Sequence, residues 1–244
     1  MKKLFVLFFF LLTTCLIVCS SKIAIAEQPS DDEDIRTKVM IHPVKGEPEL
    51  EKMLFIFRKA KNNTPPVSAG EDNPSYKLIA KGLRWASLPV SYGINSSTYF
   101  AVVEKGFEEW DNWSSKEIFN PPAVIIGGNL ERDNSNTVSW QPLTTLFGSD
   151  VIAITQIIYN TRTKIILEFD MAFNTDLPWG IANPAAFDAQ NITTHEAGHV
   201  LSLSDLYRLQ TSELTMYGYA TEGELKKQTL GNGDKLGLWS IFGK

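Results

Sequence analysis

Two histidines four residues apart, His195 and His199, with a glutamate directly after the first, restrict the fold of this chain more than any other feature. Four residues are slightly more than one turn of an α-helix, so the two imidazoles project from one helix face and can share a metal ion. Glu196 emerges beside them, where it can take a proton from a water molecule at that metal. The apolar pattern of residues 186–203 predicts the helix itself. The alternative is a solvated helix that carries these residues without a metal, but the spacing favours a zinc site.

A catalytic zinc ion needs three protein ligands, and the sequence leaves the third one open. The only other histidine, His42, lies far away in the N-terminal region. Asp205 follows His199 by six residues and offers a carboxylate oxygen, although such a residue can also simply bond the backbone of a turn. Glu222 and Glu224 are the candidates if the arrangement is that of a gluzincin, which takes a glutamate from a later helix.

The N-terminus has the layout of a secretory signal peptide. Lys2 and Lys3 precede an apolar run over residues 4–18, and small residues follow at Ala24 and Ala26. A membrane anchor is the rival interpretation, but the run of about fifteen residues is short of the ~20 that span a bilayer. We therefore expect cleavage near Ala26 and a secreted or extracytoplasmic protein without a stable membrane anchor.

Both cysteines, Cys15 and Cys19, lie within this predicted signal peptide, so the mature chain has no disulfide. Cys19 raises the possibility of a lipid anchor, but Val18 stands where a small residue is expected. An exported chain without disulfides must be held by its core, by metal, or by both. Removal of residues 1–26 leaves 20 basic residues against 28 acidic ones, a net charge of −8, because three of the 23 lysines and arginines are lost. Such a charge does not attract nucleic acid or an anionic membrane.

Residues 27–76 are predicted to be a leader or propeptide-like region, and residues 77–244 a folded catalytic domain. An acidic run occupies residues 31–34, and residues 59–74 are rich in Lys, Asn, Pro and Gly. Between them, residues 50–57 could form one short helix or strand. A propeptide and a flexible N-terminal arm both fit this composition.

Strand and helix patterns alternate from residue 77 onward. A capping box at Thr221–Glu224 precedes the last predicted helix. Partial segregation of strands and helices argues for an α+β fold. The expected strands are 88–92, 123–126, 151–159 and 164–173, and the expected helices are 96–112, 186–203 and 233–242.

The zinc motif and the residues after it resemble those of the metzincins, whose pattern is H-E-x-x-H-x-x-G-x-x-H/D followed by a methionine turn. Residues 195–205 carry the zinc motif here, and residues 212–219, with Met216, resemble the methionine turn. The chain is most similar to the matrixin-like domains of bacterial and archaeal matrixin-adamalysin type. Further matching motifs occur in the family's order over roughly residues 80–244, at 84–90, 107–110, 169–179 and 233–243.

This resemblance implies a secreted zinc metalloendopeptidase, a hydrolase with a twisted mixed sheet, an active-site helix and a C-terminal helix. His195, His199 and Asp205 would bind Zn²⁺, and Glu196 would be the general base that activates a zinc-bound water for peptide hydrolysis. Met216 would form the hydrophobic floor beneath the metal, the alternative being an ordinary core methionine. We expect a monomer that acts on protein or peptide substrates and has no nucleic-acid partner.

Four departures from the family pattern bear on this expectation. Ser202 replaces the glycine that lets the backbone turn sharply toward the third ligand. Asp205 replaces the commoner histidine, as in some exported microbial members of the superfamily. The leader has no cysteine for the latch of animal matrixins, and histidines for a second, structural zinc are missing. A catalytically silent zinc-containing module that binds other molecules outside the cell is therefore the alternative function.

Substrate and calcium binding are the remaining expectations. The strand around residues 151–159 could bind substrate as an added β-strand. Leu206, Tyr207 and the 208–224 loop are expected to line the pocket that decides the cleavage preference. Ca²⁺ sites are possible near acidic residues that are scattered along the chain, although isolated acids more often cap turns. These residues are Asp170, Asp176 and Asp188.

Overall fold

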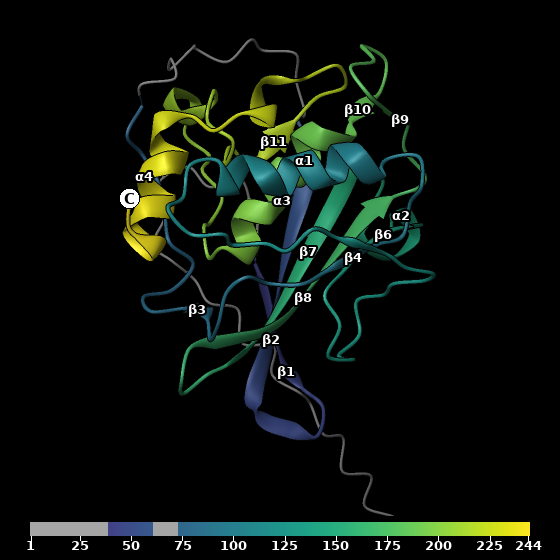
Figure 1. The fold of residues 1–244 in the computed structure, drawn as a ribbon. Coiled ribbons are helices and arrows are strands. Elements are labelled where there is room, and N and C mark those ends of the chain that lie inside the picture. Colours follow the sequence, from purple (N-terminus) through teal and green to yellow (C-terminus); the bar gives the residue numbers. More distant parts are fainter. Residues whose placement is uncertain (1–38, 61–72) are drawn as a thin grey trace, which may run out of the picture.

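The computed structural model describes residues 39–60 and 73–244, which form a mixed β-sheet with a few helices packed against it (Figure 1). The predicted signal peptide, with Cys15 and Cys19, lies outside the described residues. The longer strands are β1 (Met40–Val44), β2 (Glu47–Lys59), β6 (Thr137–Gln141), β7 (Val151–Asn160) and β8 (Ile165–Asn174). The two-residue strands are β3 (Arg84–Trp85), β4 (Gly93–Ile94), β5 (Ala123–Val124), β9 (Trp179–Gly180), β10 (Phe187–Asp188) and β11 (Tyr219–Ala220). The helices are α1 (Phe100–Asp111), α2 (Thr144–Phe147), α3 (Ala189–Val200) and α4 (Asn232–Phe242), with 3₁₀ turns η1 (Leu209–Thr211) and η2 (Lys226–Gln228).

The main sheet has the strand order β1-β2-β7-β8-β6-β4-β5, with β11 paired to β2 and β3 paired to β8. Pairing is antiparallel from β1 through β8 and parallel from β8 through β5. Nearly all residues of the two central strands, β7 and β8, are buried, and β7 consists largely of β-branched residues. Such residues fit a sheet that is covered on both faces.

Helices α1 and α3 cover one face of this sheet and enclose the main core (Figure 1). They approach closely because Gly106 of α1 lacks a side chain where it meets Thr193 of α3, 2.8 Å from where a Cβ would stand. The indole nitrogen of Trp110 also donates to the carbonyl oxygen of Thr194 at 2.8 Å. The opposite sheet face carries a smaller apolar cluster, which includes Leu54, Ile56, Leu143, Val151 and Ile154.

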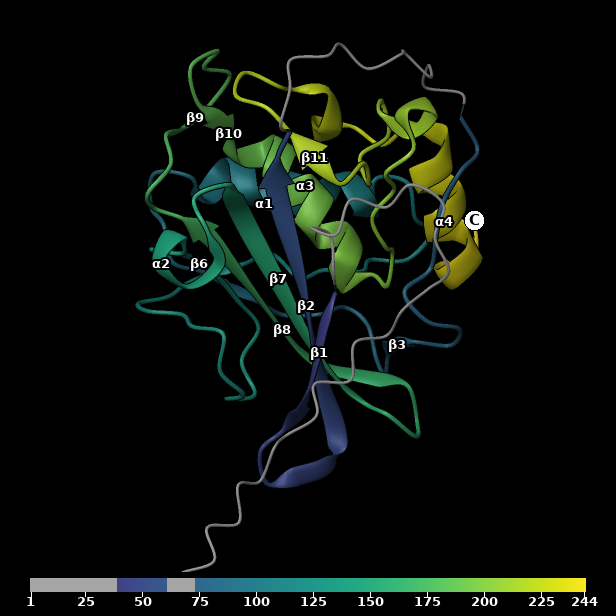
Figure 2. The same ribbon diagram turned by 180° about the vertical axis from the view of Figure 1, so that it is seen from behind.

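Strands β1 and β2 come from the region that the sequence predicts to be a leader. The register of β2 against β7 runs from Leu50 opposite Asn160 to Arg58 opposite Val151. Figure 2 shows β2 running along β7, with its C-terminal end next to β11 and beside α3. The sheet therefore does not start at residue 77. It includes β1 and β2, which lie between Met40 and Lys59.

The predicted elements around the site agree with the structure in kind. Helices α1, α3 and α4 and strands β7 and β8 all form, although α3 spans fewer residues than predicted. The prediction of a strand at residues 88–92 is wrong, because this segment makes a single isolated bridge, between Val90 and Phe119. Pro89 has no N–H for a ladder. The capping box at Thr221–Glu224 starts no α-helix. The mixed sheet and few helices are compatible with the expected α+β class.

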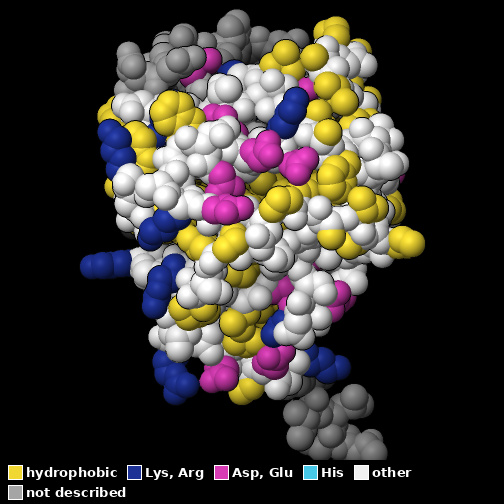
Figure 3. Space-filling view, viewed as in Figure 1, with side chains coloured by type: hydrophobic (Ala, Val, Ile, Leu, Met, Phe, Trp, Pro, Cys, Tyr) yellow, Lys and Arg dark blue, Asp and Glu magenta, His cyan; other side chains and the backbone are white. Residues whose placement is uncertain are grey.

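Several acidic side chains gather on the face shown in Figure 3, in the region where Figure 1 places α1. The sequence of α1 includes Glu104, Glu108 and Glu109. No histidine is visible on that face. Within residues 39–60 and 73–244, no helix has both the length and the apolar character needed to cross a bilayer.

Candidate metal centre

Helix α3 presents the zinc motif, and both of its ends are fixed. At the N-terminus Asp188 caps the helix by accepting from the backbone N–H of Asn191 at 2.8 Å. At the other end Ser202 takes the left-handed conformation, with φ +76°, and its hydroxyl donates to the carbonyl of Leu83 at 3.0 Å. A serine therefore makes the turn for which the family pattern has glycine. The chain is thereby directed back toward the histidines.

This turn brings Asp205 to the two histidines. Oδ1 of Asp205 lies 3.2 Å from Nε2 of His195 and 3.6 Å from Nε2 of His199. The ligand-type atoms of the three side chains all lie within 4.8 Å of one another. His195 and His199 are fully buried, and Asp205 is 8% exposed. Among the described residues, this is the group of three such side chains that could hold a metal ion.

The hydrogen bonds of the two imidazoles decide which ring nitrogen carries the proton and which one presents its lone pair to Asp205. Nδ1 of His195 contacts the carbonyl oxygen of Thr215 at 2.7 Å, and Nδ1 of His199 contacts that of Leu203 at 2.8 Å. A carbonyl oxygen only accepts, so both Nδ1 atoms carry the proton and both Nε2 atoms are acceptors in the neutral rings. This is the arrangement by which proteins orient histidine ligands.

Two buried atoms of the group consequently have no hydrogen-bond partner: Nε2 of His195 and Oδ1 of Asp205. Both are acceptors, and they face each other across 3.2 Å. Burying unpaired acceptors is costly unless a cation lies between them. Two imidazole nitrogens and one carboxylate oxygen form a donor set that suits Zn²⁺. The residues therefore fit the metal that the sequence predicts.

The protonation states agree with a ligand role. Burial lowers the pKa of His199 to about 4, although the carboxylate of Asp205 acts in the opposite direction. Burial alone would raise the pKa of Asp205, but His199, His195 and a hydrogen bond from Tyr207 outweigh it and hold the pKa below its usual value. At neutral pH, His199 is thus neutral and Asp205 ionised, as metal ligands must be.

Glu196 points from the same helix toward β7. Its Oε2 accepts a short hydrogen bond from the hydroxyl of Thr155, whereas the buried Oε1 has no partner. Burial raises the pKa of Glu196 to about 7, against the opposing effects of His195 and Thr155. One oxygen is therefore held in place while the other is free to take a proton.

Met216 packs directly beneath α3, against Gly198, which lies between the two histidines in the sequence. Its Sδ lies 2.2 Å from where a Cβ on Gly198 would stand. The carboxylate of Asp234, in α4, accepts from the backbone N–H groups of Thr215 at 2.8 Å and Met216 at 3.1 Å. The turn that holds Nδ1 of His195 is thus itself fixed from α4. The sequence shows Asp234 only as part of a helix motif, so this role was not predicted.

Two phenylalanines of β2 lie against the histidines. The ring of Phe57 stacks on that of His195 with centroids 3.9 Å apart, and Phe55 stacks on His199 at 4.3 Å. Phe55 and Phe57 are 1% and 2% exposed. The sequence offered no signal for this contact, because the two segments are about 140 residues apart and meet only through strand pairing.

The other candidate ligands lie elsewhere. Glu224 is paired with Lys227 and also accepts from the side chain of Asn191, whereas Glu222 is exposed. His42 lies in β1 opposite Lys52. None of them joins the described group of metal-type ligands.

The three acids named as calcium candidates are separately engaged. Asp170 accepts from the hydroxyl of Thr137, and Asp176 accepts from the backbone N–H of Thr144. Asp188 caps α3. Within the described residues they do not gather into a cluster of metal-type ligands.

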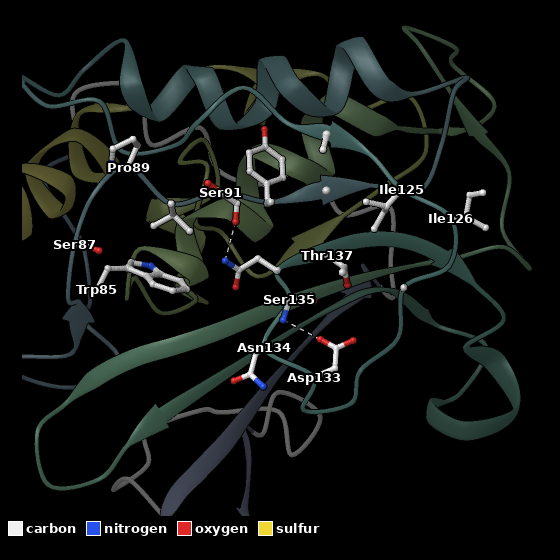
Figure 4. A pocket seen from close by; sticks show the side chains of 16 residues that line it. Trp85, Ser87, Pro89, Ser91, Ile125, Ile126, Asp133, Asn134, Ser135 and Thr137 are labelled. Atoms are coloured by element: carbon white, nitrogen blue, oxygen red, sulfur yellow. Dashed lines mark hydrogen bonds between the residues drawn. The ribbon is translucent and has the colours of Figure 1, made fainter.

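A surface pocket of about 650 Å³ opens between β4 and the loop at residues 133–136 (Figure 4). Its polar groups bond one another: Asn136 donates from Nδ2 to the carbonyl of Ser91 at 2.8 Å, and the N–H of Ser135 donates to Asp133 at 2.9 Å. The pocket shares no lining residue with the metal centre.

Comparison with protein-family models and with the sequences of curated proteins found no match. Any assignment of activity thus depends on the residues of the site itself.

Proposed function

We propose that this chain is an extracytoplasmic zinc endopeptidase of the metzincin type, with His195, His199 and Asp205 as metal ligands and Glu196 as general base. The observation that carries the proposal is the pair of buried, unpartnered acceptors, Nε2 of His195 and Oδ1 of Asp205, that face each other beside a free glutamate oxygen. The left-handed backbone of Ser202 supports the metzincin pattern, because the residue makes the turn of the family's glycine.

Each residue of the site has a defined task in peptide hydrolysis. When bound, zinc supplies a Lewis acid that polarises a carbonyl group and lowers the pKa of water to about 7. Glu196 takes a proton from the attacking water at Oε1 and gives it to the leaving amine, while Thr155 holds Oε2. The Thr215 carbonyl holds Nδ1 of His195, and Met216 packs against Gly198 between the two histidines.

A peptide is the substrate class that the surrounding strands favour. Strand β7 carries Thr155, which contacts Glu196, and the side of β7 that faces away from β8 pairs with β2 over most of its length. An extended peptide binds a sheet edge through its main-chain groups and presents alternate side chains to one face. A peptide bound in the place of β2 would have its scissile bond beside the carboxylate of Glu196.

Enclosure of the site favours a second candidate, a zinc-containing module without catalysis. His195, Glu196 and His199 are all 1% exposed or less, which leaves no room for substrate in this conformation. Structural zinc sites, however, use four protein ligands, and the described group has three, which favours a site with one open position.

Metal content and proteolysis test the proposal together. Zinc per chain should be close to one in the native protein and in Glu196→Ala, and should fall sharply in His199→Ala. Casein cleavage should disappear in Glu196→Ala. Because the site is enclosed, each protein is also assayed with Phe55 and Phe57 changed to alanine. Cleavage retained in Glu196→Ala would refute the mechanism, and zinc binding without cleavage in every background would favour the silent module.

Export is proposed from the N-terminal pattern alone. Expression in a secreting host should give an extracytoplasmic protein whose N-terminal sequence begins at Glu27. A protein that stays in the cytoplasm with Met1 intact would contradict this part of the proposal.

A further inference from the structure

The edge of β7 beside the metal centre is the place where the sequence predicts an added substrate strand, and β2 of the same chain lies there. It pairs antiparallel with β7 from Leu50 to Arg58. Residue Thr155, which contacts Glu196, stands directly opposite Phe55 in this register. The chain's own N-terminal segment thus runs past the general base in the position of an extended peptide.

Alternate side chains of β2 face opposite sides of the sheet, as in any strand. Phe55 and Phe57 point to α3, where their rings lie nearly parallel to those of His199 and His195, at 18° and 10°. Leu54 and Ile56 point away from α3 and pack into the smaller cluster on the other face. Only one face of the strand therefore covers the metal centre.

The C-terminal end of β2 has a paired strand on each side. On one side Arg58 pairs with Val151 of β7, and on the other it pairs in parallel with Tyr219 of β11. Beside this end, the ammonium group of Lys227 lies 5.8 Å from the ring centroid of Phe57, whose other neighbour is His195. The ring of Phe57 is therefore enclosed between His195 and Lys227, so a peptide in the place of β2 would put a large apolar side chain at this position.

We propose that β2 is a built-in occupant of a peptide-binding position between β7 and β11, which keeps the metal centre enclosed until the strand is displaced. This inference rests on the proposed function and adds its regulation. Three observations carry it: the strand fills the edge beside Glu196, two phenylalanines cover the histidines, and the Glu196 oxygen beneath remains free. The ligand that replaces β2 is an extended peptide with large apolar side chains at alternate positions.

Two double variants of the zinc-loaded full-length protein test the proposal. Phe55→Ala with Phe57→Ala weakens the face that covers the histidines. Leu54→Ala with Ile56→Ala is the matched control, because it removes two large buried side chains from the same strand but on the opposite face. Two rates are measured: transfer of zinc to a chromogenic chelator and hydrolysis of a quenched fluorescent peptide.

The phenylalanine variant should transfer zinc and cleave peptide at least about tenfold faster than the native protein, since each deletion removes several kcal/mol of packing. The control should show a clearly smaller increase. A synthetic peptide of residues 50–60, added to the phenylalanine variant, should slow both rates. Equal rates in the native protein and the phenylalanine variant would overturn the proposal, as would an equal acceleration in the control.

A reversible tether keeps the proposal testable if the phenylalanine variant does not fold. Ile56 and Ile154 are register partners across β2 and β7 and face away from α3. With both changed to cysteine, the oxidised protein should transfer zinc more slowly than the same protein reduced with a phosphine. Identical rates in the two states would refute displacement of β2 as the opening step.

The two readouts separate this inference from the proposed function. Accelerated zinc transfer in the phenylalanine variant without any peptide cleavage would support the covering strand and refute the protease. Glu196-dependent cleavage at equal rates in the native protein and the phenylalanine variant would support the protease and refute the covering strand.

Discussion

The Sδ atom of Met216 lies 2.2 Å from the point where a Cβ on Gly198 would stand, so the methionine occupies the space of a missing side chain. Trp110 closes the same space from α1, with Cζ2 at 2.9 Å. The absence of a side chain at residue 198 thus lets the floor of the metal centre touch the helix backbone between the two histidines.

Gly198→Ala should therefore lower both stability and zinc affinity. Overpacking of a filled core costs about 1–3 kcal/mol, and displacement of Met216 would also move the Thr215 carbonyl that holds His195. Urea unfolding and zinc competition measure the two effects. The double variant with Met216→Ala is the control, since it removes the clashing sulfur. If the effects of the two substitutions were simply additive, the contact would not be their cause.

Tyr207→Phe should weaken zinc binding without unfolding the protein. Tyr207 hydrogen-bonds the carboxylate of Asp205 and so helps to keep the pKa of that group low. Loss of such a partner behind a metal ligand lowers metal affinity by roughly 10–100-fold. Competition with a chelator measures the affinity. Tyr219→Phe serves as the control, because its ring meets that of Tyr207 but belongs to β11. Equal affinities of native protein and Tyr207→Phe would contradict the role of this hydrogen bond.

The helix that carries His195 and His199 could be predicted from sequence because its signals are local. The spacing of the two histidines needs only helical geometry, and Asp205 lies five residues beyond Val200, the last residue of α3. The family pattern has glycine at the position of Ser202, so either the serine takes the left-handed backbone or the turn differs, and its φ of +76° is left-handed.

The covering strand could not be predicted, since its position depends on distant partners. Residues 53–57 are a continuous apolar run, which does not distinguish a buried strand from a buried helix. Their partners in β7 lie about 100 residues later, and nothing local encodes that pairing. Asp234 escaped prediction for the same reason, because its bonds to Thr215 and Met216 join elements that are distant in the chain.

Substitution of Ser202 should separate backbone strain from hydrogen bonding. Alanine keeps the unfavourable left-handed conformation and loses the bond to Leu83, so Ser202→Ala should destabilise the protein by about 1–2 kcal/mol. Ser202→Gly loses the same bond but removes the strain, and should be more stable than the alanine variant by up to about 1 kcal/mol. Urea midpoints with matched slopes give the comparison. An alanine variant as stable as the glycine variant would show that this turn carries no strain.

Asp170 should make the folded protein less stable as pH rises through the neutral range. Burial raises the pKa of its carboxyl from 3.8 to about 8, although a hydrogen bond from Thr137 opposes the shift. Between about pH 4 and pH 8 the folded state therefore holds a proton that the unfolded state has released. The unfolding free energy then falls with rising pH, by at most about 1.4 kcal/mol per unit, and levels off above pH 8.

Asp170→Asn removes this titration and is the test of it. Compared with the native protein, the asparagine variant should gain relative stability from pH 4 to pH 8, measured by urea unfolding at each pH. Parallel curves for the two proteins over this range would show that the pKa of Asp170 is not raised in the folded state.

Zinc should stabilise the folded protein through its three ligands but not through Glu196. A ligand that binds only the folded state adds about 2.7 kcal/mol to the unfolding free energy at 100 times its Kd. Asp205→Ala removes a ligand oxygen, and His195→Ala removes a ligand nitrogen, so either should abolish most of this gain. Glu196→Gln should keep it, because Oε1 of Glu196 is not part of the ligand group. Thermal unfolding with zinc and with a chelator measures the gain for each protein. Loss of the gain in Glu196→Gln would make Glu196 a ligand, whereas retention in Asp205→Ala would exclude Asp205 as the third one.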